Sequence, residues 1–405
     1  MIAEPGKAEP EGSHRAGLSP RVLFAAGFRV FFLLCGCYGC ALLLVWLAVL
    51  AGWMAAPAWL MPVWWHAHEM IFGFALAAVA GFLLTSVPAW TSTRPVSGPH
   101  LAALAALWTA GRVAMALAGQ LPLWSVALVD LLFIPAVALA IAGPILTARN
   151  RRNYGFPLVL TGLLACNVAV HLQATNPAYQ GAEAGLRIAV YLVIVLISIV
   201  GGRIVPAFTA NALRRAGQTA EVRVRPWIDR LAIAAVVLFA VIGGLAHGTL
   251  PAAVCALLAS VLLLLRMSGW QTRRTLRDPL VWSLHLGYAW LPLGLLLLGL
   301  GQLDIGISRS VGMHALTAGA MGTMVLAVMS RVALGHTGRP LAAPRPIAAA
   351  YLLVAGGALL RVAGPALSPA ASTAILQVAG VLWSGAFAVF TVVYAPILLS
   401  PRVQP

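Results

Sequence analysis

WHAHEMIFGFALAAVAGFLLTSVPAW, residues 65–90, decides the fold class because its last twenty-one residues carry no charge. At ~1.5 Å per residue, a helix of that length matches the ~30 Å hydrocarbon core of a bilayer. The stretch therefore predicts a membrane-spanning helix. Its start is unusual, since His66, His68 and Glu69 are ionisable groups that are costly in hydrocarbon unless they are paired, ligated or hydrated. We therefore expect a functional site at this end of the helix.

The rest of the chain has the same character, with 61% hydrophobic and only 9% charged residues among 405. These values lie far from those of soluble domains and predict an all-α polytopic membrane protein with about twelve transmembrane helices. We expect a polar tail over residues 1–22, one transmembrane domain over residues 23–399 and a second tail over residues 400–405. The expected spans are approximately 23–50, 64–89, 100–118, 122–147, 156–175, 186–208, 228–247, 250–268, 279–301, 309–334, 346–364 and 372–399.

The net charge of +16 comes from Lys7 and twenty-five arginines, which alternate with the expected spans. Arginines gather in every second connection, whereas the other connections hold little beyond Arg187 and Arg309. By the positive-inside rule, this pattern places both termini in the cytoplasm. Short, scattered basic loops form no continuous groove, which argues against nucleic-acid binding. No connection is long enough for a soluble catalytic domain, so any chemistry must take place among the helices.

Histidines gather at one predicted level of the membrane, near the outer side. In this topology His66 and His68 open the second span, His314 lies near the start of the tenth, and His171 lies near the end of the fifth. Imidazole is a ligand of both iron and copper. An outer layer of His66 or His68, His171 and His314 is therefore the expected first metal centre, although a hydrogen-bonded interfacial side chain is the ordinary explanation for any one of them.

Helical geometry separates the two histidines of WHAHEM. His66 and Glu69 share a face at i and i+3, whereas His68 is rotated by about 200° from His66, so a regular helix cannot direct both at one metal. Three interpretations remain open: one histidine is structural, two centres flank the helix, or the helix begins later. Glu69 could orient a ligating imidazole or transfer protons.

Arg112 in the third span and Asp130 in the fourth come out at similar depths and are expected to form an ion pair. The pair could be purely structural. Alternatively, Arg112 could bind an anionic group of a cofactor, such as a haem propionate. Toward the inner side of the membrane lies a second layer of basic residues, which consists of Arg29, Arg203, His285 and Arg331. Two explanations remain open: the side chains snorkel to the inner surface, or they form a second site or a proton route.

The second and tenth spans share one further pattern. In each, a histidine near the outer end is followed 25 or 26 residues later by Arg-Pro, at Arg94-Pro95 and Arg339-Pro340. This suggests an internal repeat, although the two spans are not six apart as in many transporters.

Several longer stretches resemble the NnrS family of bacterial membrane proteins, and together they extend over most of the chain. Val30 and Ala89 depart from the residues that are usual in that family, without touching an expected ligand. The stretches are WHAHEM (65–70), GFLLTSVPAWT (81–91), GGRIVPAFTANAL (201–213), HLGYAWLPLG (285–294) and HALTAGAMGTMVLAVMSRVALGHTGR (314–339).

The resemblance implies a multi-pass protein of the bacterial inner membrane that contains haem, expected to be of b type, and copper, and that is associated with denitrification and the nitric oxide response. Its motifs include His66, His68, His285, His314 and His336, with His171 as a further match, and the first four are expected to have cofactor or metal roles. His171 is a further cofactor-binding candidate, and so is Arg112 on the depth argument given above. Supporting or proton-transfer roles are expected for Glu69, Arg203, Arg331 and His336. Binding, detoxification and protection of metal centres remain open, as do enzymatic turnover and the electron donor.

A secondary transporter is the alternative function, because twelve spans with cytoplasmic termini are common in that class. It predicts that Glu69, Arg112 and Arg203 line a water-accessible path and that the chain has a six-plus-six repeat, which the sequence does not show.

Overall fold

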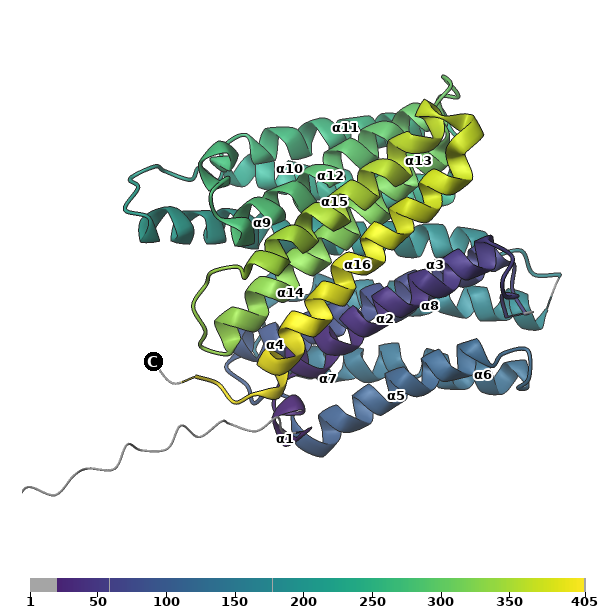
Figure 1. The fold of residues 1–405 in the computed structure, drawn as a ribbon, viewed down its shortest axis with the longest axis horizontal. Helices are drawn as coiled ribbons and strands as arrows, with labels where there is room; N and C mark the ends of the chain where they lie inside the picture. The colour runs from purple at the N-terminus through teal and green to yellow at the C-terminus, as the bar shows by residue number, and fades with distance from the viewer. Residues whose placement is uncertain (1–19, 58, 177, 404–405) are drawn as a thin grey trace, which may run out of the picture.

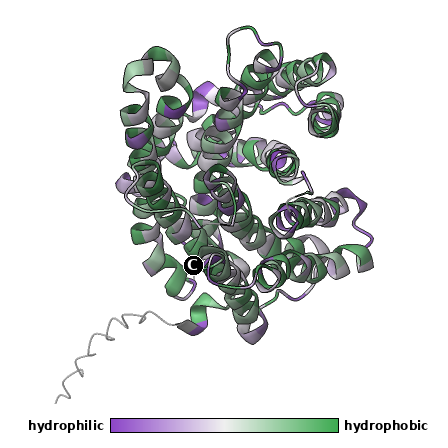
Figure 2. Ribbon diagram, turned by 90° about the vertical axis from the view of Figure 1, so that its right-hand side faces the viewer, coloured by the Kyte–Doolittle hydropathy of each residue, from purple (hydrophilic) through white to green (hydrophobic). Residues whose placement is uncertain are grey.

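The computed structural model describes residues 20–57, 59–176 and 178–403, so most of the tail expected over residues 1–22 lies outside the described residues. Within the described residues the chain is helical, and the long helices run side by side along one direction (Figure 1). Figure 2 shows hydrophobic residues over much of the length of these helices. Each of the twelve expected spans corresponds to a helix or to a run of consecutive helical segments.

The N-terminal half contains the first six spans. After the short α1 (Pro20–Leu23), they are α2 (Gly27–Leu50), the run α3 (Pro62–His68), η1 (Glu69–Ala75) and α4 (Leu76–Thr91), then α5 (Gly98–Ala116), the pair α6 (Leu123–Leu131) and α7 (Phe133–Thr147), then α8 (Gly155–Thr175) after η2 (Arg151–Asn153), and α9 (Ala182–Arg215).

The C-terminal half contains the other six spans. They are α10 (Pro226–Leu245), α11 (Leu250–Met267), α12 (Pro279–Gln302) after η3 (Thr272–Thr275), the run α13 (Arg309–His314), η4 (Ala315–Met321) and α14 (Gly322–His336), then α15 (Arg345–Leu367), and α16 (Ser372–Leu399) after η5 (Pro369–Ala371).

Eleven of these helices are long and apolar enough to cross a membrane. The expected span that falls outside this set is α5, which is 19 residues long and contains the charged Arg112. Proline begins several of the helices, as at Pro226 and Pro279, where the missing N–H costs no hydrogen bond. The fold is that of an all-α polytopic membrane protein, as the sequence predicts.

Two spans are built in the same unusual way. The second span changes from α-helix to a seven-residue π-helix directly after His68, and the tenth does so directly after His314. π-Helical segments are rare and often occur at functional sites. The helix preceding each of these spans, α2 or α12, has 24 residues, and in both an aromatic residue at the twelfth position lies against a glycine of the π-helix.

That contact requires glycine. A Cβ on Gly73 would lie 2.4 Å from Cε1 of Tyr38, and a Cβ on Gly319 would lie 2.5 Å from Cδ2 of Trp290. We name α2, α3–η1–α4 and α5 the first unit, and α12, α13–η4–α14 and α15 the second unit. The Arg-Pro pattern of the sequence thus belongs to a wider correspondence between spans that are eight apart.

An apolar cavity of about 80 Å³ lies between the two units. Its wall includes α4 from Ala78 to Leu83 and α14 from Met324 to Met329, and α9 closes another side. All the residues that line it are apolar or glycine. The cavity therefore begins immediately beyond both π-helices, on the side of the arginine-rich connections.

Candidate metal centre and the second histidine cluster

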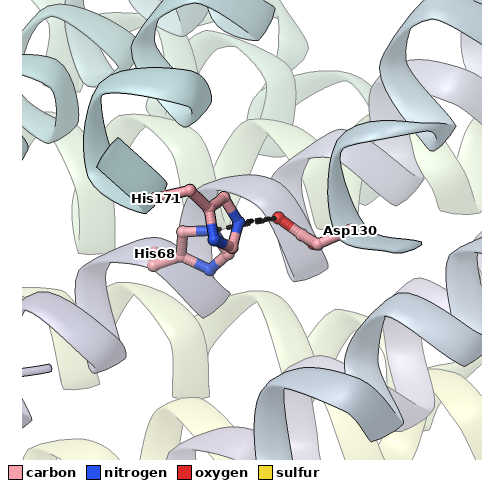
Figure 3. Close-up of side chains that lie close together, drawn as sticks. All are labelled: His68, Asp130 and His171. Carbon is pink, nitrogen blue, oxygen red and sulfur yellow. Dashed lines mark hydrogen bonds and ion pairs between the residues drawn. The ribbon is translucent and has the colours of Figure 1, made fainter. Parts of the chain in front are cut away.

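His68, Asp130 and His171 form a buried group that could hold a metal ion. One potential ligand atom from each residue lies within 4.8 Å of the others. The two imidazole rings converge on the carboxylate of Asp130 from different helices, α3 and α8 (Figure 3). Nε2 of His171 lies 2.9 Å from Oδ2 of Asp130, and Nε2 of His68 lies 3.3 Å from the same oxygen. Two imidazoles and one carboxylate are a common ligand set for transition metals.

Four neighbouring side chains fix the geometry of this group. Arg112 donates from Nη1 to Oε1 of Glu69 at 2.7 Å and from Nη2 to Oδ1 of Asp130. Asn167 donates from Nδ2 to Oδ2 of Asp130 at 2.8 Å, and the hydroxyl of Tyr38 donates to Oε2 of Glu69. The expected ion pair of Arg112 with Asp130 is therefore confirmed, and Glu69 belongs to the same network.

His68 is held through both ring nitrogens. Nδ1 lies 2.8 Å from Oε1 of Glu69, and Nε2 lies 2.8 Å from Oδ1 of Asn167. Both nitrogens thus face oxygen atoms. Either the ring carries a proton on each nitrogen, or a cation lies between Nε2 and the oxygens.

The charges of the network show the same need for a cation. Glu69 and Asp130 contribute two negative charges, and Arg112 contributes one positive charge. All three side chains are at most 7% exposed. Uncompensated charge is costly in such surroundings, so a proton on an imidazole or a carboxyl group, or a metal ion, is required to balance the remaining negative charge.

His66 lies on the other side of the same helix and belongs to a second cluster. Its ring stacks on Trp46, with ring centroids 4.5 Å apart, and interacts electrostatically with His314 and Arg361. Nη2 of Arg361 lies 3.1 Å from Nε2 of His314, and Nδ1 of His314 lies 2.8 Å from the carbonyl oxygen of Ser310. Of the three interpretations of WHAHEM left open by the sequence, the structure therefore matches two clusters flanking one helix.

A sequence model of the NnrS protein matches residues 22–402, nearly the whole chain. The chain belongs to the NnrS family. No curated protein matches it. This NnrS-family chain therefore combines the family sequence with a polytopic helical fold in which a possible metal site of two histidines and an aspartate is buried between helices.

The histidines expected to form one outer layer divide between the two clusters: His68 and His171 lie in the first, and His66 and His314 in the second. The other expected site residues lie elsewhere. His285 is held between Thr209 and Thr272, at 2.8 Å and 3.0 Å from their hydroxyls, so neither ring nitrogen is free.

The remaining inner residues are likewise separate from both clusters. Arg203 donates to Asn153 Oδ1 at 2.7 Å, the guanidinium of Arg331 lies 4.1 Å from the ring centre of Phe208, and the ring of His336 packs against Phe28. Arg29 donates to the carbonyl oxygens of Leu398 and Ser400. Proton-transfer roles for this inner layer stay predictions.

Sequence reasoning missed Tyr38, Asn167 and Arg361, and it did not predict Asp130 as a metal ligand. Asn167 could have been found, because it precedes His171 by four residues and so shares its helix face. Asp130 was expected only as a partner of Arg112. Arg361 carried no distinguishing signal, since a lone arginine near the end of a span also fits snorkelling.

Proposed function

We propose that this chain is a haem- and copper-binding protein of the bacterial inner membrane that acts in the nitric oxide response of denitrification-type metabolism. Membership of the NnrS family supports the proposal. The observation that carries the metal part is the buried group of His68, Asp130 and His171, whose nitrogen and oxygen atoms converge within 4.8 Å.

The donor set fits copper. Nitrogen and oxygen ligands together suit Cu(II), and copper binds such sites more tightly than other divalent first-row metals. Nε2 of His68, Nε2 of His171 and a carboxylate oxygen of Asp130 would hold the ion. A copper ion held there would supply one-electron chemistry. Glu69 would keep Nε2 of His68 directed at the metal by accepting a hydrogen bond from Nδ1, as carboxylates next to ligating histidines commonly do.

For haem, the second cluster offers one suitable nitrogen. Nδ1 of His66 is buried and has no hydrogen-bond partner among the described residues. Both ring nitrogens of His314, in contrast, are engaged by Ser310 and Arg361. Of these two histidines, His66 is therefore the one that would hold haem iron, whereas His314 would hold Arg361 in place beside it.

The cavity between the two units suits a small apolar gas. On a measure by which one water molecule needs about 10–15 Å³, the volume of about 80 Å³ leaves room for a diatomic gas, and the lining offers water no polar side chain. Nitric oxide is small and nearly apolar, so it can dissolve in the bilayer and occupy such a space without polar contacts. The cavity thus gives the gas a place among the helices that carry the histidines.

The proposal is tested with the full chain purified in detergent from cells supplied with haem and copper. We expect a Soret band that shifts on addition of nitric oxide, together with stoichiometric iron and copper. His171→Ala should remove copper and leave the Soret band, whereas His66→Ala should remove the Soret band and leave copper. His100→Ala is the control, because His100 lines a groove with Arg94 on the arginine-rich side. A colourless, metal-free protein from such cells would refute the proposal.

The transporter alternative expects Glu69, Arg112 and Arg203 along one path and a six-plus-six repeat. Glu69 and Arg112 do lie together in the buried network. The correspondence seen here joins spans that are eight apart rather than six, and Arg203 hydrogen-bonds Asn153 rather than either cluster. Solute flux in proteoliposomes, unchanged in metal-free His171→Ala, would favour the transporter.

A further inference from the structure

The second histidine cluster consists of three basic side chains from three helices. His66 comes from α3, His314 from α13 and Arg361 from α15. Nη2 of Arg361 donates to Nε2 of His314 at 3.1 Å and to Oγ of Ser310 at 3.5 Å. Because Nε2 of His314 accepts this hydrogen bond, His314 is neutral and its proton is on Nδ1, which donates to the carbonyl oxygen of Ser310.

Within the part of the chain that the structure describes, no acidic group balances the charge of this cluster. No carboxylate there pairs with Arg361, and the side chains that accept its hydrogen bonds, Ser310 and His314, are not acidic. Arg112, at a similar place in the first unit, is paired with two carboxylates. A guanidinium within a membrane-spanning helix is costly without a counter-charge.

The cluster also has hydrogen-bond donors that no protein group accepts. The hydrogen bonds of Arg361 within the described chain use Nη2 alone, which leaves Nη1 and Nε to donate to another molecule. A positive charge with unused donors, and with no acidic partner among the described residues, favours the binding of an anion.

We propose that Arg361, positioned by His314 and Ser310, binds a singly charged planar oxyanion or carboxylate at the predicted outer side of the membrane. A guanidinium donates two parallel hydrogen bonds to the two oxygens of such a group, which gives it preference over a spherical ion. The anion has two possible sources: a small inorganic oxyanion that exchanges with solution, or the carboxylate of a larger molecule that stays bound. The proposal does not depend on copper in the first cluster.

Nitrate is a suitable probe because it is planar, singly charged and a weak metal ligand. The unfolding temperature of the detergent-purified full chain is measured over a nitrate titration at constant ionic strength. We expect a saturable rise of a few degrees, because a ligand that binds only the folded state stabilises it. Arg361→Gln should abolish the rise. Arg309→Gln is the matched control, because Arg309 lies at the start of the same span as His314 and pairs with Asp304.

A permanently bound carboxylate gives a different result. Wild-type protein would then show no response to nitrate, but on denaturation it would release a stoichiometric carboxylic acid other than haem, detected by mass spectrometry, that Arg361→Gln protein lacks. Arg361→Lys, which keeps the charge but not the planar fork, should bind either anion more weakly than wild type. The proposal is overturned if wild-type protein neither responds to nitrate nor releases a carboxylic acid, or if Arg361→Gln responds as wild type does.

Discussion

The two units share a helical framework and differ in the acidic residues that surround it. In each, a histidine ends an α-helix, a seven-residue π-helix follows, and an arginine of the next span lies close by. Glu69 follows His68, whereas Ala315 follows His314. The first unit joins a network that contains the buried carboxylates of Glu69 and, from the neighbouring α6, Asp130. In the second unit, no carboxylate of the described residues pairs with Arg361. The framework sets where imidazole and guanidinium meet, and the acidic residues decide whether the site needs a cation or an anion.

The largest expected effect in this comparison is that of Arg112→Ala. Removing the guanidinium leaves Glu69 and Asp130 as like charges in a buried site, which costs roughly 3–5 kcal/mol of folding free energy. Unfolding in detergent, followed by heat or denaturant, measures the loss. Adding Glu69→Gln and Asp130→Asn to the same protein should restore much of the stability. A loss below about 1 kcal/mol for Arg112→Ala would contradict the view that the network is balanced by its charges.

The shared framework predicts similar effects in both units for the glycines of the π-helices. Gly73→Ala would press a Cβ against Tyr38, and Gly319→Ala would press one against Trp290, at separations of 2.4 Å and 2.5 Å. Overpacking of this kind costs roughly 1–3 kcal/mol. Gly356→Ala in α15 is the control, because a Cβ there meets nothing within 4 Å. If one of the two substitutions proved harmless, the units would not share the contact.

The membrane fold could be predicted from sequence because hydrocarbon forces the chain into helices of a fixed minimum length. Depth along those helices was enough to predict the pairing of Arg112 with Asp130. The π-helices could not be predicted, because an uninterrupted apolar stretch is equally compatible with the regular period of 3.6 residues. The expected histidine layer divides into a cluster with His68 and His171 and a cluster with His66 and His314. This division depends on which helices pack together, which the apolar pattern does not specify.

A smaller effect is expected from Glu69→Gln, which tests the metal role of the first unit. The amide can still accept from Nδ1 of His68, but it no longer carries the negative charge that strengthens the imidazole as a ligand. Affinity for copper, measured by competition with a chelator, should fall about 10–100-fold. Ala315→Ser, at the corresponding position of the second unit, should leave copper affinity unchanged. An equal fall in both variants would show that the effect is structural rather than directed at the metal.

The smallest effect is expected from Arg361→Ala in buffer without nitrate. This substitution removes hydrogen bonds from a charged donor to two neutral acceptors, each worth about 1.5–3 kcal/mol, but it also removes a charge that no carboxylate of the described chain balances. The two effects oppose each other, so the unfolding free energy should change by about 1 kcal/mol or less, against roughly 3–5 kcal/mol for Arg112→Ala. A loss as large as that of Arg112→Ala, in protein from which no carboxylic acid is released, would mean that the fold itself supplies a negative partner for Arg361. The difference between the two units would then lie in their geometry rather than in their charge.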